Sequence, residues 1–143
     1  MLHRIIHSFA ASLILVASSL HADSTAVEAS NGWINNLPPS VPMRAGYLQL
    51  NNNSDQAVRL VGVESSAFER VEIHETRMQD GVMKMQELDH INIPASGAAE
   101  LKPGAMHLMM MNPKIDLNPG TEIPVTLHFN DGGVQQVSFK VKK

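Results

Sequence analysis

Apolar and polar residues alternate over short segments through most of the chain after residue 45. This period of two is typical of β-strands with one face buried. Clusters of Asn, Asp, Pro and Gly separate the segments, and Asp80-Gly81 is the strongest hairpin signal among them. The alternating segments are 47–50, 58–63, 68–75, 82–88, 91–93, 106–111, 125–129 and 134–141. The pattern predicts an all-β fold of eight or nine short strands, an antiparallel β-sandwich or Greek-key barrel.

The N-terminal segment 1–22 has the pattern of a secretory signal peptide. Arg4 supplies a positive charge, an apolar stretch follows, and small residues lead to Ala22, with Ala26 as the alternative cleavage point. The apolar stretch is shorter than the roughly 20 residues of a membrane span. We therefore expect residues 1–22 to be removed and residues 23–143 to form one exported, periplasmic domain. Because the cleavage region has no cysteine, we expect no lipid attachment.

Residues 23–40 are polar and rich in Asn and Pro, apart from Trp33, Ile34 and Leu37. We expect an extended arm here, with Trp33 packed against the body of the domain.

Composition excludes several classes of protein. The net charge is −3 and the sequence contains no basic stripe, so nothing in it indicates binding to nucleic acid. The absence of cysteine excludes disulfides, a thiolate nucleophile and a blue-copper electron-transfer centre. The sequence contains no serine–histidine–acid motif, so it gives no indication of an enzyme. Methionine is the unusual residue: the chain has 9, and seven of them lie between Met78 and Met111.

The methionine-rich segment 106–111 also carries a histidine. On a strand, His107, Met109 and Met111 share one face, and Met106 and Met110 share the other. Thioether and imidazole together favour Cu(I), whereas zinc sites use Cys, His and carboxylate. Methionine also fills irregular cores, so a packing role is the alternative at this point.

A second histidine precedes the Asp80-Gly81 turn, and more methionines follow it. The hairpin should bring His74 close to Met85 or Met83, which share a face.

The spacing His74-x10-Met85-x21-His107-x-Met109 resembles the signature of the periplasmic copper chaperones of the PCu(A)C family. The resemblance extends over residues 30–141. It implies a cupredoxin-like β-sandwich in which His74, Met85, His107 and Met109 bind one Cu(I). It further implies delivery to the binuclear copper site of cytochrome c oxidase subunit II, together with a Sco-type protein. We expect a monomer that carries copper and is not an enzyme.

The remaining candidates have smaller expected roles. Met83 is the competitor of Met85 as a ligand, and Met111 is expected to line the pocket. We expect Met106 and Met110 to lie in the core, Met78 to shield the site or be exposed, and Met43 at most to cap the metal. We expect Glu75 to anchor an imidazole, and His90 and His128 to lie outside the site. Two alternative functions stay open. One is copper storage or resistance with the same ligands, and the other is a metal-free β-sandwich interaction module.

Overall fold

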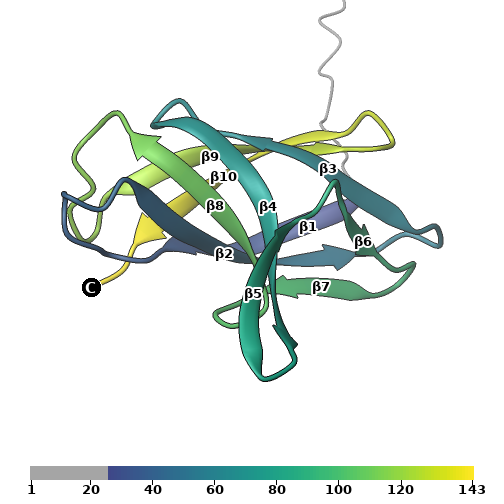
Figure 1. Cartoon of the computed structure of the whole chain (residues 1–143). Helices are drawn as coiled ribbons and strands as arrows, with labels where there is room; N and C mark the ends of the chain where they lie inside the picture. The colour runs from purple at the N-terminus through teal and green to yellow at the C-terminus, as the bar shows by residue number, and fades with distance from the viewer. Residues whose placement is uncertain (1–25) are drawn as a thin grey trace, which may run out of the picture.

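The computed structural model describes residues 26–143, which form ten strands and contain no helix (Figure 1). The strands are β1 (Val27–Ile34), β2 (Met43–Asn52), β3 (Val58–Glu64), β4 (Phe68–Gln79), β5 (Val82–Glu87), β6 (Ile91–Ile93), β7 (Ala98–Leu101), β8 (Met106–Pro113), β9 (Glu122–Phe129) and β10 (Val134–Val141). The expected signal peptide, residues 1–22, lies outside the described part. Within that part, no helix has the length and apolar character needed to cross a membrane.

Hydrogen bonding links the strands in the order β5-β4-β8-β2-β1-β10-β9-β3-β6, and β7 also pairs with β2. The connected sheet folds over into two layers, so that β3 also approaches β4 (Figure 1). Non-consecutive neighbours such as β4 and β8 require crossover connections between the layers. This arrangement confirms the predicted β-sandwich, with one departure: β1 runs parallel to β10, whereas the other strand pairs are antiparallel.

The core lies between the two layers and follows directly from the alternating pattern. On β9, Ile123, Val125, Leu127 and Phe129 are buried, while the residues between them are exposed or half-buried. Each strand that alternates in this way contributes one apolar face to the same cluster of side chains. Burial of that cluster is the main stabilising contribution to the fold.

The prediction of an extended N-terminal arm was wrong in part. Residues 27–34 form β1, which is hydrogen-bonded to β2 on one side and to β10 on the other. A bulge between Ser30 and Trp33 interrupts the alternation, which hides the strand from a pattern search. Gly32 is needed at this bulge, because a Cβ atom there would lie 2.7 Å from Phe139. Trp33 packs against the body as expected, on Tyr47 at 4.4 Å between ring centroids.

Strand β7 was also missed, which explains why ten strands are present instead of eight or nine. Its four residues are too few to show a clear alternation. The hairpin at Asp80-Gly81 is confirmed. Asp80 and Gly81 have φ values of 52° and 77°, and Gln79 pairs with Val82. Two consecutive positive φ values define the type I′ turn that an Asp-Gly pair favours.

Candidate metal centre

Strand register brings the four candidate ligands to one face of β5, β4 and β8. His74 on β4 lies directly opposite His107 on β8, and Met85 on β5 lies opposite Thr76, two residues beyond His74. Met109 follows His107 by two residues and therefore points to the same side of the sheet. On the opposite face of β8, Leu108 and Met110 are fully buried in the core.

An open depression of about 270 Å³ lies on this face. Its lining includes three of the four candidate ligands, Met85, His107 and Met109. Met43 also lines it. His74 lies next to the depression, with its ring centroid 5.9 Å from that of His107 and the two rings tilted by 48°.

His107 is only 5% exposed, and its orientation is fixed by the backbone. Its Nδ1 lies 3.1 Å from the carbonyl oxygen of Ala105. A carbonyl oxygen only accepts hydrogen bonds, so Nδ1 carries the proton and donates it. In the neutral ring, Nε2 then keeps its lone pair, which is the form required of a metal ligand.

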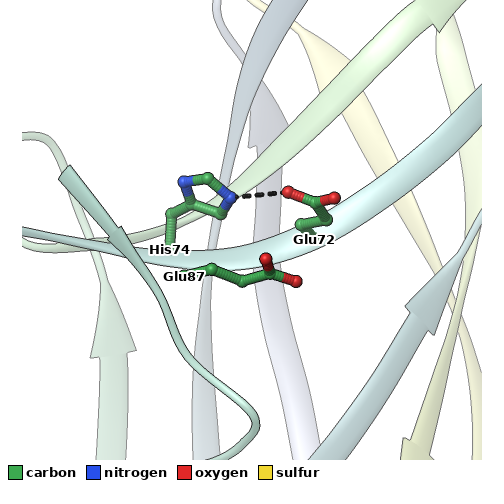
Figure 2. Close-up of side chains that lie close together, drawn as sticks. All are labelled: Glu72, His74 and Glu87. Atoms are coloured by element: carbon green, nitrogen blue, oxygen red, sulfur yellow. Dashed lines mark hydrogen bonds and ion pairs between the residues drawn. The ribbon is translucent and has the colours of Figure 1, made fainter.

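His74 is oriented in the complementary way. Its Nε2 lies 2.8 Å from Oε2 of Glu72 (Figure 2). Because an ionised carboxylate only accepts hydrogen bonds, the N–H group at Nε2 donates to it. Nδ1 of His74 is buried and has no hydrogen-bond partner among residues 26–143. A buried polar atom without a partner is unfavourable and therefore calls for an explanation. A metal ion bound at this lone pair would supply the missing partner.

Glu72 acts as the acceptor that holds His74, a role the sequence reasoning had assigned to Glu75. Glu75 instead pairs with Arg77. The correct choice was available from the strand period, because residues 72 and 74 share a face and residue 75 lies on the other. The other carboxylate oxygen of Glu72, Oε1, forms an ion pair with Nη2 of Arg70 at 2.8 Å, so both oxygens of Glu72 have a partner.

Glu87 lies near the same histidine, on the neighbouring strand (Figure 2). Ligand atoms of Glu72, His74 and Glu87 all lie within 4.8 Å of one another. Imidazole and carboxylate would suit a harder cation than Cu(I). However, a metal there would have to displace the Arg70 and His74 contacts of Glu72. The present geometry therefore indicates that the carboxylate group orients His74.

The other methionines divide between core, site and surface. Met110 is fully buried as expected, but Met106 is only half-buried and packs against the edge of the core. Met111 does not line the depression; its Sδ lies 3.6 Å from Nη2 of Arg70. Met78 and Met83 are exposed on the β4–β5 hairpin.

The other two histidines of residues 26–143 lie away from the depression. His128 pairs with Glu64 at 3.3 Å, and His90 lines a separate hollow on another part of the surface.

A buried arginine holds the loop that borders the depression. Arg44 donates through Nη1 to the carbonyl oxygens of Val41 and Met43, and through Nη2 to those of Leu37 and Pro38, at 2.6–3.3 Å. Burial lowers the pKa of the Arg44 guanidinium. These bonds fix the backbone on which Met43 enters the site.

Comparison with known proteins gives the class of domain that this fold and cluster define. The copper-bound PCuAC domain from PmoF2 is similar in fold, with a TM-score of 0.70 at 20% identity over 82% of this chain and 93% of that one. The Cu(I) form of DR1885 from Deinococcus radiodurans has a TM-score of 0.62 at 32% identity, covering 83% of this chain and 78% of that one. The domain is thus a β-sandwich of the PCuAC type, as the sequence resemblance predicted.

The family follows from the sequence comparisons. The model of the family described as putative lipoprotein LpqE-like matches residues 27–141. A putative lipoprotein from Leifsonia xyli, Lxx21020, is 34% identical over 117 residues, which are 81% of this chain and 69% of that protein. The chain belongs to the LpqE-like family.

Proposed function

We propose that this chain is an exported copper carrier that binds Cu(I) through His74, Met85, His107 and Met109. One observation carries the proposal. Within the described part of the chain, the buried Nδ1 of His74 has no hydrogen-bond partner, and its ring lies 5.9 Å from that of His107, beside a depression lined by Met85 and Met109. Two imidazoles and two thioethers form a neutral, soft donor set, which favours Cu(I) over Ca²⁺, Mg²⁺ or Zn²⁺. The copper-bound PmoF2 domain and the Cu(I) form of DR1885 support the same cargo.

The position of the site supports transport of copper and not permanent storage or catalysis. Met85 is 54% exposed, and the depression is open to solvent. An acceptor protein can approach such a site and replace the ligands one at a time, so that copper passes without release as a free ion. The preformed hydrogen bonds of both imidazoles reduce the ordering required when copper enters.

We further propose delivery to the binuclear copper site of cytochrome c oxidase subunit II, together with a Sco-type protein, by a monomeric carrier in the periplasm. The resemblance of the four-residue spacing to copper chaperones supports this assignment. The description of the family and of the Leifsonia relative as lipoproteins supports export. This chain itself contains no cysteine to which a lipid could be attached.

Anaerobic competition for Cu(I) against a chromophoric chelator tests the ligand set. Met85→Leu and His107→Gln preserve approximate size but remove the donor or change its geometry. Each should weaken Cu(I) binding by more than about tenfold, which corresponds to 1.4 kcal/mol. Met106→Leu and His128→Gln are the matched controls, because they alter the same residue types outside the site, and both should bind as the unmodified chain does.

Two outcomes would contradict the proposal. Failure of the unmodified chain to compete for Cu(I) would leave a metal-free interaction module. Binding of Zn²⁺ or Cu²⁺ that depends on Glu87 and ignores Met85 would instead assign a harder cation to the carboxylate cluster. Transfer of bound Cu(I) to the isolated copper domain of subunit II, with and without a Sco-type protein, then separates delivery from storage.

A further inference from the structure

The β4–β5 hairpin extends beyond the body of the sandwich. Pairing between β4 and β8 ends at Glu75, opposite Met106, whereas pairing between β4 and β5 continues to Gln79 and Val82. The tip therefore consists of two strands, with no third strand of residues 26–143 beside them (Figure 1). Every residue of β5 is exposed.

Three methionines occupy one face of this tip. Met78 lies directly opposite Met83, and Met85 follows Met83 by two residues on the same face. Their exposed fractions are 67%, 62% and 54%, respectively. None of the ten described strands covers them, so the usual explanation of methionine as a filler of irregular core space does not apply here.

Hydrogen-bond parity brings these side chains close together. The amide of Leu88 donates to the carbonyl of Ile73 at 2.8 Å, which makes 73–88 a hydrogen-bonded pair. Pairs alternate along an antiparallel ladder, so Met78–Met83 is a non-hydrogen-bonded pair. In such pairs the Cα atoms are about 4.5 Å apart and the side chains lie closer together. With three rotatable bonds each, the thioethers of Met78, Met83 and Met85 can converge on one point.

The charges around the tip permit a cation on this face. Arg77 lies opposite Lys84, and both point to the other face of the hairpin. The methionine pair at the far side of the depression, Met43 opposite Met111, differs in this respect. Arg70 lies against the sulfur of Met111, and its positive charge disfavours a second cation there.

We propose that Met78, Met83 and Met85 form an auxiliary Cu(I) site of three thioethers, here called the hairpin site. Thioether donors without imidazole or carboxylate select Cu(I). Because Met85 belongs to both sets, copper can move inward by exchange of Met78 and Met83 for His107 and Met109 while Met85 stays bound. No electron is transferred in this exchange. Its role in loading the central site rests on the function proposed above.

Anaerobic Cu(I) titration of the chain spanning residues 23–143, followed through methionine methyl resonances, tests the hairpin site. The first equivalent should shift Met85 and Met109. A second equivalent should shift Met78 and Met83, and it should bind more weakly because Met85 is already bound to the first ion. In the double variant Met78→Leu/Met83→Leu, the second equivalent should be lost and the affinity for the first should change by less than about twofold. In His107→Gln, Met78 and Met83 should still respond to Cu(I).

A matched pair of variants distinguishes a metal site from a surface that binds a protein. Leucine keeps the apolar surface of methionine but removes the sulfur, whereas Met111→Leu makes the same change elsewhere on this face, outside the lining of the depression. Loading from a small Cu(I) complex should slow only in the hairpin variant. Absence of a second equivalent in the unmodified chain would overturn the hairpin site. So would slowing in Met78→Ser/Met83→Ser without slowing in the leucine variant, because hydrophobic docking would then be responsible. Failure of the unmodified chain to bind the first equivalent of Cu(I) would instead contradict the central site of His74, Met85, His107 and Met109.

Discussion

Met110 and Met83 belong to the same connected sheet, but their surroundings are opposite. Met110, on β8, is fully buried among the apolar side chains of the core. Met83, on β5, is 62% exposed on a hairpin tip that has no third strand. In the first position methionine contributes packing, whereas in the second it contributes no core packing and its sulfur is accessible from solvent. The comparison shows that a count of methionines does not identify a copper site until burial separates the two groups.

The largest expected effect is on the stability of the core. Met110→Ala should lower the free energy of unfolding by about 2–5 kcal/mol, because it leaves a cavity between packed layers. Met83→Ala should change it by no more than about 0.5 kcal/mol. Denaturant unfolding monitored by Trp33 fluorescence measures both. Equal effects would show that the hairpin tip contributes packing after all.

The loop before β2 provides a contrast to the tip, since a buried side chain holds it from within. Arg44→Met keeps an apolar stem but removes the guanidinium that serves four backbone carbonyls. We expect a loss of about 2–3 kcal/mol in unfolding free energy, since four partly buried carbonyl acceptors lose a charged donor.

Arg59→Met is the control for this change. Its side chain is exposed on β3, so the free energy of unfolding should stay within about 0.5 kcal/mol of that of the unmodified chain. Equal stability of both variants would contradict the role assigned to Arg44.

The next prediction concerns the two faces of β4. Glu72→Gln removes the charged acceptor of the hydrogen bond from Nε2 of His74. Loss of such a hydrogen-bond partner of a ligand histidine typically lowers metal affinity 10–100-fold. We expect Cu(I) affinity to fall by about tenfold with the fold unchanged, as measured by chelator competition. Glu75→Gln is the matched control on the opposite face, where the carboxylate pairs with Arg77, and it should leave affinity unaltered.

Sequence patterns predicted the sandwich well where strands alternate cleanly, as β9 does, and failed where they do not. β1 was not predicted because its bulge breaks the alternation of apolar and polar residues. β7 was not predicted because it has only four residues. At the site, alternation correctly placed His107 and Met109 on the face opposite Met110. It could not separate Met111 from the depression, because the Arg70 contact joins strands that are distant in sequence.

The unpartnered Nδ1 of His74 was equally beyond sequence reasoning. Which ring nitrogen is free depends on where Glu72 places its carboxylate, and that in turn depends on side-chain packing. The identity of an imidazole ligand can therefore be proposed from spacing, whereas its tautomer has to be obtained from the structure.

The smallest expected effect tests whether the hairpin tip opens independently of the body. Gly81 has φ of +77° in a turn between two unsupported strands, and Gly132 has φ of +86° in the turn between β9 and β10. A Cβ atom at either glycine meets no neighbouring atom, so Gly→Ala adds only backbone strain, about 1 kcal/mol. Strand β3 pairs with β9 close to the second turn, so Gly132→Ala should lower global stability by that amount.

Gly81→Ala should instead speed amide exchange at Arg77 and Lys84, a hydrogen-bonded pair of the tip, by about fivefold, the equivalent of 1 kcal/mol, with a smaller change in the unfolding midpoint. Hydrogen exchange followed residue by residue measures the difference between the two regions. An unchanged exchange rate at the tip, together with a lowered midpoint, would mean that the tip opens only when the whole sandwich unfolds. A tip that opens on its own can rearrange its thioethers around an incoming ion without disturbing the core, and this is the property that the role proposed for Met85 requires.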